Sequence, residues 1–369
     1  MAASIVVSAA LARAQSRGGH VWFVLQYLLG FRKLGCRVTF VDRVDSAEQD
    51  PAGVLRLLAR HDDGIDVAVL GPDGRSVGGL TRAQVAERLR RSSLLLNVMG
   101  YLDDEDLRDE APRRVFLDVD PGYPQIWREQ GLANVLDGHD AYVTVALNLG
   151  EQACTIPTCG LEWLRTLQPV VLDRWPSRAG GDAWTTVATW RGPYGVVEHA
   201  GRAYGSKVHE FRKVIELPHN VRPRLRVALD IDRSEPADLA RLREGGWEVL
   251  DPGREAGNAD RYRDFVQASR AEFSVAKPLY VETQSGWFSD RTACYLASGK
   301  PAVVQDTGLG DHLPTGDGLL TFTTADEAAA AIDRVERDYA LHVEAARSVA
   351  EEHFDSDRVL GRLLEAVAA

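Results

Sequence analysis

One stretch in the C-terminal half carries the residue types of an anion site. It contains, in order, Lys277, Ser285, Gly286, Ser289, Asp290 and Arg291. Ser289 or Asp290 can cap a helix, and the free N–H groups at a helix N-terminus attract negative charge. Lysine and arginine side chains add positive charge at the same place. The pattern fits the diphosphate site of a nucleotide donor, and it also fits an ordinary strand–helix unit with a capped helix.

Two more cations lie earlier in the same half. Arg191 follows an apolar strand expected over 184–190, and Lys207 comes shortly after it. The carboxyl ends of parallel strands meet at one edge of a sheet, so both side chains can reach the crevice at Ser289. A pair of solvated surface side chains is the alternative. We expect Arg191 and Lys207 to contribute to donor binding.

Two residues of the N-terminal half can accept a proton. His20 stands before a helix expected over 21–34, and Asp120 follows a strand expected over 114–118. A histidine or carboxylate facing a cleft can act as a general base. The alternatives are a capping histidine and a turn aspartate. We expect His20 and Asp120 to be the catalytic residues.

Loops at strand ends in the N-terminal half are expected on the acceptor side of the cleft. Their candidate residues are Gly18, Gly19, Asn97 and Asp118. Asp118 and Asp120 form an Asp-x-Asp pair, which holds a divalent metal in some nucleotide-sugar enzymes. A turn with one aspartate in the cleft explains the pair better, so we expect no metal. The Gly-x-Gly-x-x-Gly fingerprint of dinucleotide binding is absent.

Two successive α/β patterns must position these residues. Strands are expected over 4–8, 37–41, 66–70, 93–97, 114–118, 141–145 and 168–172, and then over 184–190, 224–230, 248–250, 273–276 and 301–305. Helical segments alternate with many of them, which favours parallel sheets. The expected organisation is an N-terminal domain over 1–174, a linker over 175–183, a C-terminal domain over 184–345 and C-terminal helices over 346–369.

Composition restricts the class of protein. The chain has 369 residues, of which 45% are hydrophobic and 26% charged, as in globular proteins, and two domains are the prior expectation. The net charge of −11 and the lack of a basic run argue against a nucleic-acid partner. The four cysteines show no zinc spacing and fit a reducing cytoplasm. Residues 3–14 are better explained by a first strand and loop than by a signal peptide, and we expect no transmembrane segment.

The stretch from Ser285 to Gly308 resembles the donor-binding region of bacterial GT-B glycosyltransferases. Tyr295-Leu-Ala-Ser-Gly-Lys-Pro-Ala-Val-Val has their sequence of small-residue helix, Gly, x, Pro and apolar strand, and an Asp-Thr-Gly ends it. The resemblance extends to the whole chain through the paired α/β domains. It implies two Rossmann-like domains facing each other across a cleft, with C-terminal helices crossing the junction, and it adds Thr307 and Gly308 to the donor site.

The resemblance also implies an activity. It is transfer of a sugar, of the hexosyl type, from a nucleoside diphosphate to a small or medium acceptor, without a metal or a cofactor. Retaining members carry Glu-x7-Glu, whereas here Glu282 and Asp290 take those places. Inverting members use a base in the N-terminal domain, a role open to His20 or Asp120, so the stereochemical outcome is open. The partners expected are a nucleotide sugar and a small molecule, and a homodimer is compatible with the sequence.

Two other functions fit the same residues. One is a nucleotide-sugar epimerase, with carboxylates such as Glu210, Glu282 and Asp290 closing on the sugar. The other is a transferase-like subunit without activity, which the departure from Glu-x7-Glu allows. Fold resemblance alone does not separate these functions.

Overall fold

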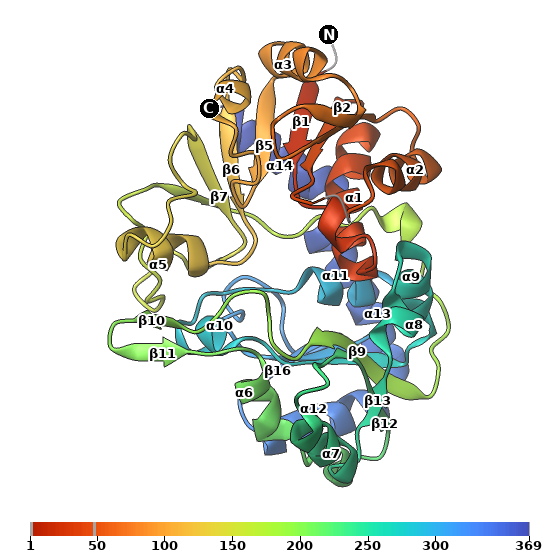
Figure 1. Ribbon diagram of the computed structural model, residues 1–369. Coiled ribbons are helices and arrows are strands. Elements are labelled where there is room, and N and C mark those ends of the chain that lie inside the picture. Colours follow the sequence, from red (N-terminus) through yellow and green to blue (C-terminus); the bar gives the residue numbers. More distant parts are fainter. Residues whose placement is uncertain (1–2, 47–48, 369) are drawn as a thin grey trace.

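The computed structural model describes residues 3–46 and 49–368. Figure 1 shows two lobes, each built on a sheet with helices against it. The first lobe contains the strands of the N-terminal half, and the second lobe contains those of the C-terminal half. α14, which ends the described chain, returns to the first lobe (Figure 1).

The sheet of the first lobe has eight strands among the described residues, in the order β4-β3-β2-β1-β5-β6-β7-β8. The strands are Ser4–Ser8 (β1), Arg37–Arg43 (β2), Asp66–Leu70 (β3), Ser76–Gly79 (β4), Leu94–Val98 (β5), Arg114–Asp118 (β6), Ala141–Thr144 (β7) and Trp163–Arg165 (β8). Neighbouring strands pair in parallel, except β3 and β4. The strand order reverses direction at β1, where open α/β sheets bind ligands.

The sheet of the second lobe has the order β13-β12-β9-β14-β15-β16 and is parallel throughout. Its strands are Ala183–Thr189 (β9), Arg224–Asp230 (β12), Glu248–Leu250 (β13), Ala271–Ser274 (β14), Ala302–Gln305 (β15) and Leu319–Phe322 (β16). An antiparallel hairpin, Val197–His199 (β10) and Arg202–Tyr204 (β11), projects from it. Here the order reverses between β9 and β14.

The helices cover the faces of the sheets. In the first lobe they are Gly18–Lys33 (α1), Pro51–His61 (α2), Arg82–Arg90 (α3), Glu105–Arg108 (α4) and Tyr123–Glu129 (α5). In the second they are Val208–Phe211 (α6), Pro236–Glu244 (α7), Pro252–Ala256 (α8), Ala259–Ala268 (α9), Pro278–Glu282 (α10), Asp290–Ala297 (α11), Ala325–Arg337 (α12) and Tyr339–Val349 (α13), and Ser356–Ala368 (α14) packs on the first lobe. α13 contacts α11 while α14 contacts α1, which confirms the expected crossing.

An aromatic contact joins the two lobes beside α1. Trp22 is buried on α1, and its ring centroid lies 4.9 Å from that of Trp175. Its indole N–H donates to the carbonyl of Ala259, on α9 of the second lobe, at 2.7 Å. The largest hydrophobic cluster therefore contains residues of both lobes.

Most expected elements are present, with some differences. The prediction of a strand over 168–172 is wrong, because Val170 makes a single bridge to Asp355 and Leu172–Arg174 is a 3-10 turn. β4, β8 and β16 were not expected. The domain boundaries stay predictions, and positions 1, 2 and 369 lie outside the described residues. Among those described, no helix is both long and apolar enough to span a bilayer.

Candidate functional site

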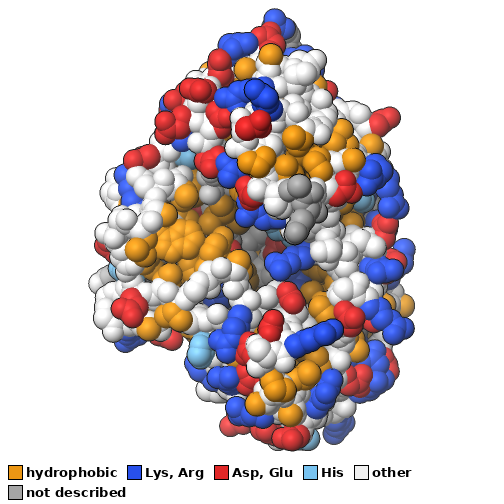
Figure 2. Space-filling view, in the orientation of Figure 1, with side chains coloured by type: hydrophobic (Ala, Val, Ile, Leu, Met, Phe, Trp, Pro, Cys, Tyr) orange, Lys and Arg blue, Asp and Glu red, His pale blue; other side chains and the backbone are white. Residues whose placement is uncertain are grey.

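A hollow separates the two lobes on the face shown in Figure 2. Hydrophobic side chains gather on one side of the hollow, and lysine or arginine side chains lie on the other (Figure 2). Most of the contacts described below come from loops after β1, β6 and β7 in the first lobe and after β9, β14 and β15 in the second. These are carboxyl ends of parallel strands, the ordinary place for a ligand in such folds.

Asp120 and Lys277 form an ion pair between the lobes. Lys277 follows β14 and precedes the first turn of α10, and its Nζ lies 2.5 Å from Asp120 Oδ1. The hydroxyl of Tyr280, one turn further along α10, donates to the same carboxylate oxygen. Asp120, expected as a base, is thus engaged by a cation and a hydroxyl.

Three tyrosine rings surround the Lys277 ammonium. Its Nζ lies 4.8 Å from the ring centroid of Tyr123, 5.2 Å from that of Tyr280 and 5.4 Å from that of Tyr194. Tyr123 begins α5 in the first lobe, and Tyr194 belongs to the loop after β9. Aromatic faces attract a cation within about 6 Å, so the rings hold the ammonium at the cleft.

Lys207 brings a second ammonium to this region. It is half-buried before α6. Burial, together with the positive charges of Arg291 and Lys277, lowers the pKa of Lys207 to about 7. Like charges disfavour the protonated amine, which means that the region has an excess of positive charge. A bound anion would remove that penalty.

Arg291 has a different environment from the one expected. Its Nε lies 2.5 Å from Glu272 Oε1, Nη2 donates to Ser274 Oγ at 2.5 Å, and Nη1 donates to the carbonyl of Val187 at 3.0 Å. All three guanidinium nitrogens are engaged inside the second lobe. The geometry gives Arg291 the role of fixing α11 against β14 and β9, while its charge still adds to the field at Lys207.

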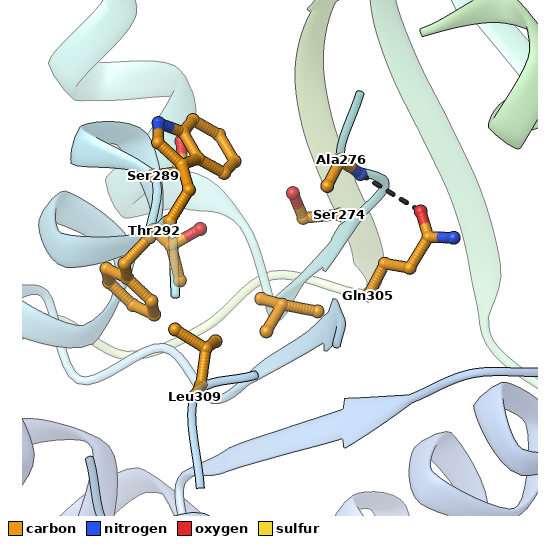
Figure 3. Close-up of a pocket in the computed structure, with 9 residues that line it drawn as sticks. Ser274, Ala276, Ser289, Thr292, Gln305 and Leu309 are labelled. Carbon is orange, nitrogen blue, oxygen red and sulfur yellow. Dashed lines mark hydrogen bonds between the residues drawn. The ribbon is translucent and has the colours of Figure 1, made fainter. Parts of the chain in front are cut away.

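The N-terminus of α11 borders a small cavity, shown in Figure 3. The cavity has a volume of about 10 Å³ and is lined by Ser274, Ala276, Trp287, Phe288, Ser289, Thr292, Val304, Gln305 and Leu309. The buried Thr292 hydroxyl has no hydrogen-bond partner among the described residues. This volume suits one water molecule. A larger ligand has to bind outside it, in the open cleft.

His20, on α1, lies within the electrostatic influence of Asp290, at the start of α11. Nε2 of His20 contacts the carbonyl oxygen of Ala10, in the loop after β1. Since a carbonyl only accepts, Nε2 carries the proton and Nδ1 keeps its lone pair. Burial lowers the pKa of His20, and the nearby negative charge of Asp290 raises it in part. A neutral imidazole of this kind can accept a proton from an acceptor hydroxyl or amine.

The loop residues expected at the donor form a second junction between the lobes. The Gly286 N–H donates to the Thr307 carbonyl at 2.7 Å, and the Ser285 carbonyl accepts from the Asn148 N–H at 3.1 Å. Asn148 Nδ2, from the first lobe, donates to the Gly308 carbonyl at 2.9 Å. Loops from the two lobes are therefore in contact here, because the carboxyl edges of the two sheets face each other.

Other residues expected at the site bind elsewhere in the structure. Arg191 pairs with Glu235 at 2.7 Å and is half-exposed on the second lobe. Asn97 is buried and exchanges hydrogen bonds with the backbone of Leu102. Asp118 is also buried and accepts hydrogen bonds from the following residues: Gln125, Thr144 and the Asp120 N–H. Burial raises the pKa of Asp118 to about 7.

The two glycines that begin α1 face the second lobe. A Cβ at Gly18 would lie 2.2 Å from the Asn258 carbonyl oxygen, and one at Gly19 would lie 3.1 Å from Tyr262 Cε2. Gly18 thus permits the close approach of α1 to α9. In this structure the two glycines allow α1 to pack closely against the second lobe.

Sequence reasoning missed the tyrosines of the cleft. Tyr280 lies three residues after Lys277, a spacing that places two side chains on the same side of a helix. That spacing was the available signal. Tyr194 lies in a loop without a recognisable pattern, so its position follows only from the fold.

Comparison with known proteins rests on solved structures. No protein-family model matches the chain, and neither does any curated protein. An alpha-glucosyltransferase in complex with UDP-glucose and DNA containing an abasic site matches with a TM-score of 0.64, 13% identity and 100% coverage of both chains. HepE of Anabaena with UDP and glucose matches with a TM-score of 0.63, 14% identity and 99% coverage of both chains. Sucrose-phosphate synthase of Thermosynechococcus elongatus matches with 0.61, 13% and 99% of both chains.

These likenesses extend over the whole chain and show its fold. The chain has the GT-B fold, with two α/β lobes facing each other across a cleft, which confirms the expected fold class. At this level of identity the comparison shows the fold alone.

The exclusion of nucleic acid as a partner is corrected by the same comparison. Matched structures of the alpha-glucosyltransferase hold DNA with an abasic site, an A:G mismatch or an HMU base. The exclusion relied on a net charge of −11. Net charge describes the average of the surface, whereas a polyanion is bound by the local charge of a cleft. The average is therefore no ground for excluding a nucleic acid here.

Proposed function

We propose that this protein transfers a glycosyl group from a nucleoside diphosphate sugar to an acceptor. The observation that carries the proposal is the position of Lys207 and Lys277 at the carboxyl edge of the second sheet, where their charges and that of Arg291 act on one another. Structures with the same fold hold UDP or UDP-glucose. A diphosphate is the chemical group that an excess of positive charge at this edge suits.

Each part of the cleft has a role in the proposed reaction. The bond between the sugar anomeric carbon and the diphosphate oxygen breaks, and its electron pair stays on the diphosphate. Lys207 and Lys277 stabilise that charge in place of a metal. The acceptor hydroxyl or amine bonds to the anomeric carbon, and its proton passes to His20 Nδ1, for which Asp290 provides a stabilising negative charge.

Nucleotide binding and turnover test the proposal together. Thermal shifts with UDP, TDP, GDP, ADP and CMP are expected to show stabilisation by one nucleoside diphosphate, lost in Lys207→Ala and Lys277→Ala. Lys33→Ala is the matched control, because Lys33 pairs with Asp357 at the far end of α1, roughly 20 Å along the helix from His20.

Acceptor dependence separates transfer from the other functions. Free nucleoside diphosphate is expected to appear only when an acceptor is added. An isomerised nucleotide sugar formed without acceptor would indicate an epimerase. The absence of any nucleotide-induced shift in folded protein would reject the transferase function and favour an inactive subunit.

A further inference from the structure

A second and much larger pocket lies in the first lobe, apart from the small cavity at α11. It has a volume of about 540 Å³. Its residues are Ser8, Val41, Asp42, Arg43, Leu70, Gly71, Pro72, Asp73, Gly74, Arg82, Tyr101, Leu102, Asp103, Asp104 and Asp106. They come from the carboxyl ends of β1, β2 and β3, from the segment after β5 and, for Arg82, from the start of α3. Pockets of 300–1,000 Å³ hold small organic ligands.

The pocket is lined by more negatively charged than positively charged side chains. Its two arginines are already paired with its own aspartates, Arg43 with Asp103 and Arg82 with Asp104. Asp42, Asp73 and Asp106 remain outside these two pairs. Asp73 accepts the backbone N–H of Arg75 at 3.0 Å, and within the described residues its ion-pair contact is the 3.7 Å one to the largely exposed Arg75 side chain. The lining therefore offers a surplus of negative charge to a ligand.

Asp42 gives the pocket a fixed acidic floor. It is buried at the end of β2, and its Oδ2 accepts the N–H groups of Leu11 at 3.0 Å and Ala12 at 2.6 Å. These hydrogen bonds hold the loop after β1 against the pocket. Burial raises the pKa of Asp42 to about 6, so its charged form lacks full compensation and would gain from a cation.

Tyr101 supplies an unused polar group in the same pocket. Its buried hydroxyl has no hydrogen-bond partner within residues 3–46 and 49–368. Such groups are uncommon in folded proteins and call for a partner. The Arg13 guanidinium lies over the ring at 4.8 Å. A ligand that donates to the hydroxyl oxygen would satisfy it.

The pocket lies close to the groups assigned to the reaction. The loop that donates to Asp42 also carries the Ala10 carbonyl, which is bonded to His20. Arg13, which packs on Tyr101, acts electrostatically on both His20 and Tyr194. One short loop thus separates the pocket from the candidate base.

We propose that this pocket binds the acceptor, and that the acceptor is a small polyhydroxylated molecule carrying protonated amino groups. The inference rests on the proposed transferase function and names the substrate class of its acceptor side. Protonated amines pair with Asp42, Asp73 and Asp106, and hydroxyl or amino hydrogens reach the Tyr101 oxygen. A hydroxyl or neutral amine of the same molecule then points past the loop toward His20.

A matched pair of ligands tests the charge requirement. The probes are 2-deoxystreptamine, a cyclitol diamine, and myo-inositol, a neutral cyclitol, measured by calorimetry at pH 8 and low salt. The diamine is expected to bind at least about tenfold more tightly, the gain expected of a charge pair worth about 1.4 kcal/mol. Equal affinity, no binding of either probe, or displacement of the diamine by a DNA oligonucleotide would overturn the inference.

Variants locate the binding. Asp106→Asn is expected to weaken diamine binding about fivefold, while Asp63→Asn, an exposed aspartate in the turn after α2, leaves it unchanged. Both variants are expected to bind UDP like the unaltered protein. If UDP binds but Asp106→Asn leaves diamine binding unchanged, the acceptor pocket is rejected and the transferase function is not. Diamine binding that responds to Asp106→Asn, without binding of any nucleoside diphosphate, retains the cationic-ligand pocket and rejects the transferase function.

Discussion

Lys277 Nζ of the second lobe lies 2.5 Å from Asp120 Oδ1 of the first. The lysine proposed for the diphosphate and an aspartate expected as a base therefore neutralise each other. A diphosphate that binds Lys277 has to compete with this carboxylate. When the diphosphate of the donor binds Lys277, it replaces the Asp120 carboxylate as the partner of the ammonium.

Asp120→Asn is expected to strengthen UDP binding. The amide removes the negative charge that competes for Lys277, so the ammonium is free to pair with phosphate. We expect the Kd for UDP, measured by calorimetry, to fall roughly three- to tenfold, because a charge pair contributes about 1 kcal/mol. Tyr280→Phe is the control, because it removes the hydroxyl from the same carboxylate and keeps the charge. Weaker UDP binding in Asp120→Asn would contradict the competition.

The affinity for UDP is expected to depend on pH through Lys207. Its pKa is lowered to about 7, mainly by burial, so the amine is mostly neutral at pH 8.5. Phosphate favours the protonated form, and binding then takes up a proton. The affinity should fall as pH rises above 7, approaching about tenfold per pH unit. Lys207→Met should flatten this dependence between pH 7 and 8.5, and an equally flat profile in the unaltered protein would show that Lys207 is not at the phosphates.

The same lowered pKa has a consequence for stability. The unfolded chain binds the Lys207 proton more tightly than the folded protein does between pH 7 and the ordinary lysine pKa. The contribution of this residue to the free energy of unfolding should therefore rise with pH across that range. Thermal melting of the unaltered protein and Lys207→Met at pH 7 and pH 9 measures the difference.

Arg291→Met is expected to lower the free energy of unfolding and to have little direct effect on UDP binding. Glu272 is fully buried, and its second oxygen already lacks a partner among the described residues. Removing the guanidinium leaves a buried carboxylate uncompensated, which costs about 3–5 kcal/mol. The melting temperature should fall clearly, and Arg291→Met combined with Glu272→Gln should recover part of the loss. An unchanged melting temperature with lost UDP binding would place Arg291 at the donor instead.

The sequence predicted the order of strands and helices because apolar periodicity and glycine stops are local features. It also placed Lys277 and Asp120 after strands and Lys207 shortly after Arg191, where the topology brings all three to one cleft. The pairing of Asp120 with Lys277 joins residues 157 positions apart, and no local pattern specifies such a partner. The same holds for the surplus negative charge of the 540 Å³ pocket, because its residues come from several separate segments of the first lobe.

A buried carboxylate in β14 was the sequence signal for the structural role of Arg291. Glu272 stands in β14 with apolar or small neighbours, and a charge inside a buried strand requires a partner. Arg291, in α11, is the cation that meets this requirement. The signal for a structural arginine was thus present, but the likeness of the surrounding segment to a donor site favoured the other assignment.

Gly18 and Gly19 offer a matched test of the contact between the lobes. A methyl group at Gly18 would meet the Asn258 carbonyl at 2.2 Å and Tyr262 Cβ at 2.5 Å, whereas one at Gly19 meets only a ring carbon at 3.1 Å. Backbone atoms give way less easily than the edge of a ring. Gly18→Ala should therefore destabilise the protein by roughly 1–3 kcal/mol, with Gly19→Ala within about 1 kcal/mol of the unaltered protein. Thermal melting measures both, and equal stability of the two variants would show that α1 and α9 can separate without loss.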